Sequence, residues 1–330
     1  MPAATPATPV TPVTDSVRLT MRAWWRQKRS LVVVPLALAA GLSACSGSAS
    51  DTAAEGQSAP SQAPQPTTQH QQGAEPGAVG LPSSHVHGVG IDPGDGLLYL
   101  ATHDGLFRYE PTGPKRIGPV NDLMGFTIAG PAHYYASGHP GAGSDLPDPV
   151  GLIESRDAGR TWTQLSRQGL SDFHALAASS RAVLGYDGTL RTSSDGATWT
   201  SLSAPVQPFA LTSSPDGAVL LATSQDGPVR SSDAGQTWSM IPAAPLLLLV
   251  AWAGGTQDTA VGVTPEGQVL ISTDAGLTWD ERGRVEGAPQ ALSASSADTG
   301  DVHVQVVTDT TVVTSTDGGR TFAALPASVR

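Results

Sequence analysis

The octapeptide that decides the fold of this chain is Ser155-Arg156-Asp157-Ala158-Gly159-Arg160-Thr161-Trp162. Its pattern returns in copies that begin at Ser231, Ser272 and Ser315, and in a copy from Ser193 that is one residue shorter. The copies follow one another at about 40 residues, which is the length of one repeated structural unit. Ser and Asp oxygens can accept hydrogen bonds from turn amides, and Gly can supply a positive φ. The repeat therefore predicts a series of equivalent tight turns between strands.

The pattern resembles the Asp-box, or BNR repeat, of sialidase-like and sortilin-like β-propellers. The resemblance implies an all-β fold in which four-stranded blades surround a channel. Dividing the intervals into strands gives six blades, with seven as the alternative, and β-branched runs such as Val302–Val307 support strands. We expect the Asp-box residues to be structural rather than catalytic: Asp157, Trp162, Asp195, Trp199, Asp233, Trp238, Asp274, Trp279, Asp317 and Phe322.

The N-terminal segment has the features of a targeting signal. A basic stretch precedes an apolar run from Leu31 to Leu42, which is too short to span a bilayer core of about 30 Å. Its ending, Leu42-Ser43-Ala44-Cys45, resembles the bacterial lipobox, whose Cys receives a diacylglyceryl group. We expect a lipoprotein signal peptide over 1–45 (translated from Met1 or Met21), a disordered Ser-, Gln- and Pro-rich tether over 46–80, and the propeller over 81–330. The chain would then be secreted and held by the Cys45 lipid on the outer side of the bacterial cell membrane.

The net charge limits the classes of partner, and the cysteine content limits how the fold can be stabilised. Removal of residues 1–44 takes away five basic residues and one acidic residue, which leaves 13 basic and 28 acidic side chains and a formal charge of −15. This balance argues against nucleic acid and is compatible with cationic ligands or metals. Cys45 is the only cysteine, so the folded part must be stable without disulfides.

Histidines are unevenly distributed, and propeller topology makes their positions informative. In the expected strand order, strand starts and the loops between second and third strands lie on one face, the top. Six side chains are predicted to converge there over three neighbouring blades: His85, His87, His103, Met124, His139 and His174. Of these, His139 is expected in the loop that follows the strand His133–Gly138, in a blade whose first strand is expected over Leu123–Ala129. Imidazoles with a thioether are ligand types for Cu or Zn, and Asp104 or Asp172 could orient a ring. The alternative is that these histidines fill the channel mouth and bond to backbone carbonyls; His133 and His303 are expected to be structural.

Local motifs around these histidines form a second resemblance. They are His85-Val86-His87-Gly88, Ala101-Thr102-His103-Asp104-Gly105-Leu106-Phe107, Met124-Gly125-Phe126, Ser137-Gly138-His139-Pro140 and Asp172-Phe173-His174-Ala175. The set resembles bacterial secreted lipoproteins with BNR-type propellers, usually labelled sialidase-like or glycosyl hydrolase-like. The resemblance implies a shared top-face site over residues 81–330, but a label based on fold does not establish the chemistry.

Three functions stay open at this level. The first is a binding module that holds a transition metal, a polar ligand or a glycan at the top face. The second is an exo-acting glycoside hydrolase on envelope or environmental glycans, with Asp104 and Glu266 as weak candidate carboxylates; the arginines do not form the triad of a sialidase. The third is a scaffold for an envelope protein.

Overall fold

The computed structural model describes residues 80–325 except 84, 298 and 299. The expected signal peptide with Cys45, and all of the expected tether but Gly80, lie outside the described residues. Within the described part of the chain every regular element is a strand, which confirms the all-β prediction. No helix there has the length and apolar character needed to cross a membrane.

The strands form four four-stranded sheets and one eight-stranded sheet. The first sheet holds β1 (Val86–Ile91), β2 (Leu98–Thr102), β3 (Gly105–Glu110) and β4 (Gly113–Ile117). The second holds β5 (Asn121–Gly130), β6 (His133–Pro140), β7 (Leu152–Ser155) and β8 (Thr163–Ser166). The third holds β9 (Ala175–Ala178), β10 (Val183–Tyr186), β11 (Leu190–Ser193) and β12 (Thr200–Ser201). The fourth holds β13 (Leu211–Ser213), β14 (Leu220–Ala222), β15 (Val229–Ser231) and β16 (Ser239–Met240).

The eight-stranded sheet repeats the same four-strand pattern twice. Its strands are β17 (Leu249–Gly254), β18 (Ala260–Val263), β19 (Gln268–Ser272), β20 (Asp280–Arg284), β21 (Pro289–Ser296), β22 (Val302–Thr308), β23 (Val312–Ser315) and β24 (Ala323–Ala324). Neighbours within β17–β20 and within β21–β24 pair antiparallel, whereas β17 and β21 pair in parallel through Ala253–Gly254 and Ala294–Ser295.

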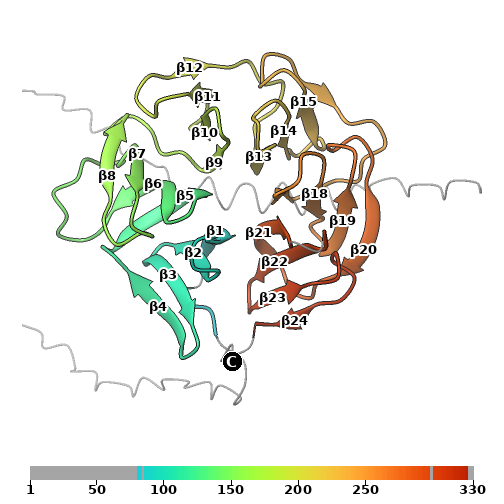
Figure 1. Ribbon diagram of the computed structural model, residues 1–330. Coiled ribbons are helices and arrows are strands. Elements are labelled where there is room, and N and C mark those ends of the chain that lie inside the picture. The colour runs from blue at the N-terminus through green and yellow to red at the C-terminus, as the bar shows by residue number, and fades with distance from the viewer. Residues whose placement is uncertain (1–79, 84, 298–299, 326–330) are drawn as a thin grey trace, which may run out of the picture.

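The sheets are arranged radially, as in a β-propeller (Figure 1). The strands β1, β5, β9, β13, β17 and β21 lie toward the centre and contact one another in a closed ring, whereas β4, β8, β12, β20 and β24 lie outside. Apolar side chains fill the spaces between neighbouring sheets. Tyr134 of β6, for example, makes an edge-on ring contact with Tyr99 of β2 in the preceding sheet and another with Phe126 of β5 in its own sheet, and Tyr99 and Tyr134 are fully buried. The first and last groups of strands meet through Val86 and Leu98, which pack with Val307 and Val312.

The Asp-box turns are built from hydrogen bonds within eight residues. In the copy from Ser272, the serine hydroxyl donates to Asp274 and accepts from the Gly276 amide, each at 2.8 Å. The carboxylate of Asp274 also accepts from the amide and the hydroxyl of Thr278 at 2.9 and 2.5 Å. The copies that contain Asp157, Asp233 and Asp317 repeat these bonds.

Backbone geometry in these turns differs from expectation at one position. The residue before the recurring glycine of the box also has positive φ, with 58° at Ala158, 56° at Ala234 and 59° at Ala275, and Gly318 occupies this position in the last copy. The turn needs two successive left-handed residues, so one glycine does not account for its shape.

Each Asp-box turn also contacts the preceding group of four strands. A Cβ on Gly276 would lie 2.5 Å from the side chain of Leu221, and one on Gly319 would lie 3.0 Å from Val269. The box therefore fills space against its neighbour as well as closing its own strand pair. In the shorter copy the indole of Trp199 donates to Ser166 of the preceding sheet at 2.8 Å, whereas Trp238 donates within its own box, to the Gly235 carbonyl.

Candidate functional site

A channel runs through the centre of the ring and encloses a cavity of about 1,320 Å³. Its wall is made by the innermost strands, and small residues such as Gly90, Ala177 and Ala251 keep it open. Residues near the starts of these strands, within four positions on either side, line the cavity: His87, Met124, His174, Gln207 and Gln290. These strands run side by side around the ring, so their starts surround one mouth of the channel.

The first cluster at this mouth joins three residues of neighbouring sheets. The Nε2 atoms of His87 and His103 lie 3.2 Å apart, and the His103 Nδ1 atom lies 2.7 Å from Oδ1 of Asp122. The ring of His85 stands edge-on to His103, with centroids 5.4 Å apart. The structure thus brings His85, His87 and His103 together, with a carboxylate behind His103.

Local structure explains how these rings are positioned. His87 lies in β1, and Gly88 beside it leaves room for Phe126 of the next innermost strand, since a Cβ there would lie 2.9 Å from the Phe126 Cβ. His103 follows β2 in a tight turn, in which Thr102 donates to the Gly105 carbonyl at 2.9 Å and accepts from the amide of Asp104 at 3.0 Å.

Ligand atoms of His87, His103 and Asp122 all lie within 4.8 Å of one another. Two imidazole ligands of a tetrahedral Zn²⁺, with Zn–N bonds of about 2.05 Å, are roughly 3.3 Å apart. In the structure the two Nε2 atoms share a hydrogen bond at 3.2 Å, and this distance is close to the separation that two zinc ligands would have. An Asp122 carboxylate that accepts from Nδ1–H of His103 leaves the Nε2 lone pair directed at His87, which is the arrangement that orients metal-binding histidines.

A second cluster contains His139 and His174. His139 lies between two carboxylates, with Nδ1 2.6 Å from Asp148 and Nε2 3.3 Å from Asp172. Asp172 also binds Nε2 of His174 at 2.7 Å, through the same oxygen, Oδ2. Hydrogen bonding to Asp172 raises the pKa of His139 to about 9, with Asp148 adding to the effect against the opposing burial. Burial would raise the pKa of Asp172, but the bonds from His139 and His174 hold it well below its usual range.

The two clusters meet across the β5–β6 strand pair. Asp122 and His139 are register partners, so their side chains leave the sheet on the same face. The prediction that His139 lies in a loop is wrong: it lies in β6, which continues to Pro140 opposite Asn121. With both ring nitrogens next to carboxylates, His139 is placed to pair with acids rather than to bind a metal.

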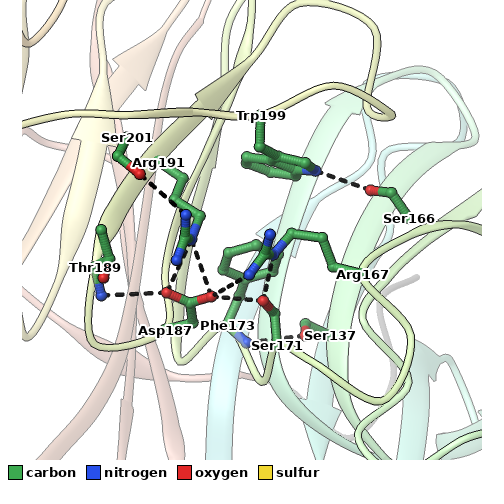
Figure 2. Close-up of polar contacts among 10 residues, drawn as sticks. All are labelled: Ser137, Ser166, Arg167, Ser171, Phe173, Asp187, Thr189, Arg191, Trp199 and Ser201. Carbon is green, nitrogen blue, oxygen red and sulfur yellow. Dashed lines mark hydrogen bonds and ion pairs between the residues drawn. The ribbon is translucent and has the colours of Figure 1, made fainter.

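A network of buried and half-buried polar groups holds the segment that carries Asp172 and His174 (Figure 2). Asp187 accepts from the hydroxyl of Ser171 at 2.5 Å and is paired with Arg167 and Arg191. The amide of Phe173 donates to the Ser137 hydroxyl at 2.9 Å. Residues on both sides of Asp172 are therefore tied to neighbouring strands, which restricts where its carboxylate can lie.

The remaining predicted residues belong to neither of the two clusters described above. Met124 is buried at 8% exposure and lines the channel. Asp104 and Glu266 are exposed in the β2–β3 and β18–β19 turns and do not line the channel. His133 is paired with Glu154 at 2.8 Å in the β6–β7 pair. Asp122 was not predicted because the expected strand begins one residue after it, at Leu123, whereas β5 begins at Asn121.

Comparisons with known proteins support the fold. No protein-family model and no curated protein sequence matches this chain. The extracellular domain of a protein described as a hybrid two component system of B. thetaiotaomicron is similar at 14% identity and a TM-score of 0.51, covering 76% of this chain and 34% of that one. The nidogen/laminin complex is similar at 14% identity and a TM-score of 0.50, covering 66% of this chain and 88% of that one. This chain therefore spans about a third of the first of these structures, and the likeness establishes the β-propeller fold alone.

Proposed function

We propose that this protein is a surface-anchored, six-bladed propeller lipoprotein that binds a transition metal, Zn²⁺ or Cu²⁺, at the mouth of its channel. The blade count follows if the eight-stranded sheet is divided at its parallel β17–β21 pairing, since each half then has the antiparallel order of the other sheets. The lipid anchor rests on Cys45 and the lipobox-like residues before it.

One observation carries the metal site: the 3.2 Å separation of the His87 and His103 Nε2 atoms, with Asp122 bonded to the far side of His103. His87 and His103 would be the ligands from these atoms, and His85 the nearest further imidazole. Imidazole nitrogens suit Zn²⁺ and Cu²⁺. The acidic chain also favours a cation over an anion.

Metal content and affinity test the site directly. Mature protein would be titrated with Zn²⁺ and with Cu²⁺, and compared with His87→Ala, His103→Ala and, as a matched control, His133→Ala. We expect one metal ion per chain in the wild type and the control, and a large loss of affinity in the other two variants. Stoichiometric binding of neither metal by the wild type at micromolar concentration would refute the proposal, as would equal binding by all three variants.

Anchoring is tested separately in a bacterial host. Cys45→Ala should abolish incorporation of labelled fatty acid and release the protein from the membrane fraction, because no other thiol is available in the chain. Labelling that persists in this variant would contradict the anchor and leave the metal site untouched.

A further inference from the structure

A second cavity, of about 750 Å³, lies between the third and fourth sheets and shares Tyr186, Gly188 and Gln207 with the channel. It is an open groove bordered by three segments: the β10–β11 turn, the connection over residues 202–207, and the β14–β15 turn. Its size falls within the range of small-molecule sites. This groove is distinct from both histidine clusters, and it opens beside the same mouth.

The side chains that line the groove favour some classes of ligand and disfavour others. Among the described residues, the groove is lined by no Lys, Arg or His, and its one charged side chain is Asp226. A phosphate, sulfate or carboxylate would therefore find a negative charge and no cation to pair with. Carboxamides from Gln207 and Gln225 and hydroxyls from Ser203 and Thr189 can both donate and accept hydrogen bonds. These groups match a ligand that is rich in hydroxyl groups.

The turn that presents Gln225 and Asp226 is held in place by its own hydrogen bonds. The fully buried Ser224 donates to the carbonyl of Gly227 at 2.8 Å and accepts from the amide of Asp226 at 3.2 Å. Across the groove, Pro205 restricts the backbone of the connecting segment. Preformed walls reduce the ordering cost of binding a flexible chain.

We infer that this groove binds the uncharged end of an oligosaccharide, whose hydroxyl groups pair with Gln225 and Asp226 while a sugar ring lies against Tyr186. A chain bound there would extend toward the channel mouth, because Tyr186, Gly188 and Gln207 border both cavities. The inference does not depend on the metal site, since none of the groove residues belongs to it.

Titration with neutral trisaccharides tests the inference. Maltotriose, cellotriose and chitotriose would each be added to the metal-free mature protein, and binding followed by calorimetry and by ligand-observed NMR. Gln225→Ala and Asp226→Ala change exposed side chains and should weaken binding of the recognised sugar by about tenfold or more, because each removes hydrogen bonds to the ligand. Asp145→Ala changes an exposed acid of another loop and should leave the affinity unchanged.

Three results would overturn the inference. They are failure of all three sugars to bind at millimolar concentration, binding that the two groove variants leave intact, and preference for an acidic sugar such as sialyllactose or for a peptide over every neutral trisaccharide. Metal titrations of the Gln225→Ala variant should match the wild type, so failure here is distinguishable from failure of the metal site.

Discussion

Replacement of Asp122 by Asn separates a metal site from a cluster of histidines that merely fill the channel mouth. The Asp122 carboxylate accepts from Nδ1 of His103 at 2.7 Å and thereby directs Nε2 toward His87. An Asn side chain has nearly the same shape and keeps an acceptor oxygen, but it loses the charge that fixes the ring. The fold should therefore persist, and the metal affinity should fall.

The size of the fall follows from the role and exposure of Asp122. Loss of a carboxylate behind a metal-binding histidine typically lowers metal affinity by about 10- to 100-fold, or about 1.4 to 2.8 kcal/mol of binding free energy. The side chains of both His103 and Asp122 are 29% exposed, so solvent screens part of the interaction. We expect Asp122→Asn to lie near the lower limit and Asp122→Ala, which also loses the acceptor, nearer the upper limit.

Competition with a chromophoric chelator would measure Zn²⁺ affinity for both variants, with Asp104→Asn as control because Asp104 is a neighbouring exposed acid. Urea unfolding without metal would check that stability is unchanged. Wild-type affinity in both Asp122 variants would refute the orienting role. Complete loss of binding in Asp122→Asn would instead indicate that Asp122 is itself a ligand.

Three further predictions concern stability and are measured by urea unfolding. Gly125→Ala should destabilise the fold by about 2–3 kcal/mol or more, because its Cβ would lie 2.1 Å from a backbone carbonyl oxygen, whereas Gly130→Ala, with nothing within 4 Å, should have little effect. His139 has its pKa raised from 6.5 to about 9 by Asp172; its contribution to stability is therefore complete below the unfolded pKa and lost as pH rises through the folded one. Between pH 6.5 and about pH 9, the free energy of unfolding should therefore fall more in the wild type than in His139→Gln. Equal falls in the two proteins would exclude the ion pair. Asp274→Ala should cost about 1–3 kcal/mol, because it removes the acceptor of its Asp-box turn, and an unchanged midpoint would contradict that role.

Much of the fold could be predicted because its signal is local. The Asp-box hydrogen bonds join residues no more than four positions apart, so the octapeptide contains nearly everything that its turn requires. Its spacing of about 40 residues then leaves room for the strands of one propeller unit. Only the second left-handed residue was missed, because three of the four full-length copies have alanine there (Ala158, Ala234 and Ala275), and alanine does not indicate positive φ.

The candidate site was predictable in outline but not in detail. The expected strand order places His87 and His103 near one another. The carboxylate that bonds to His103, however, depends on where β5 begins. Because β5 starts at Asn121, Asp122 lies within the strand and opposite His139. That register, which no short sequence window specifies, gives His103 its carboxylate and places His139 in a strand.

The sequence by itself determined the repeating turns, the all-β class and the acidic balance, because each depends on neighbouring residues or on composition. The N-terminal targeting signal stays a prediction from the sequence. Only the tertiary structure decided which imidazoles meet, which carboxylate orients them, and that a polar groove opens beside the channel. These features join residues from separate strands and sheets, so they exist only once the innermost strands have closed into a ring and fixed the distances between them.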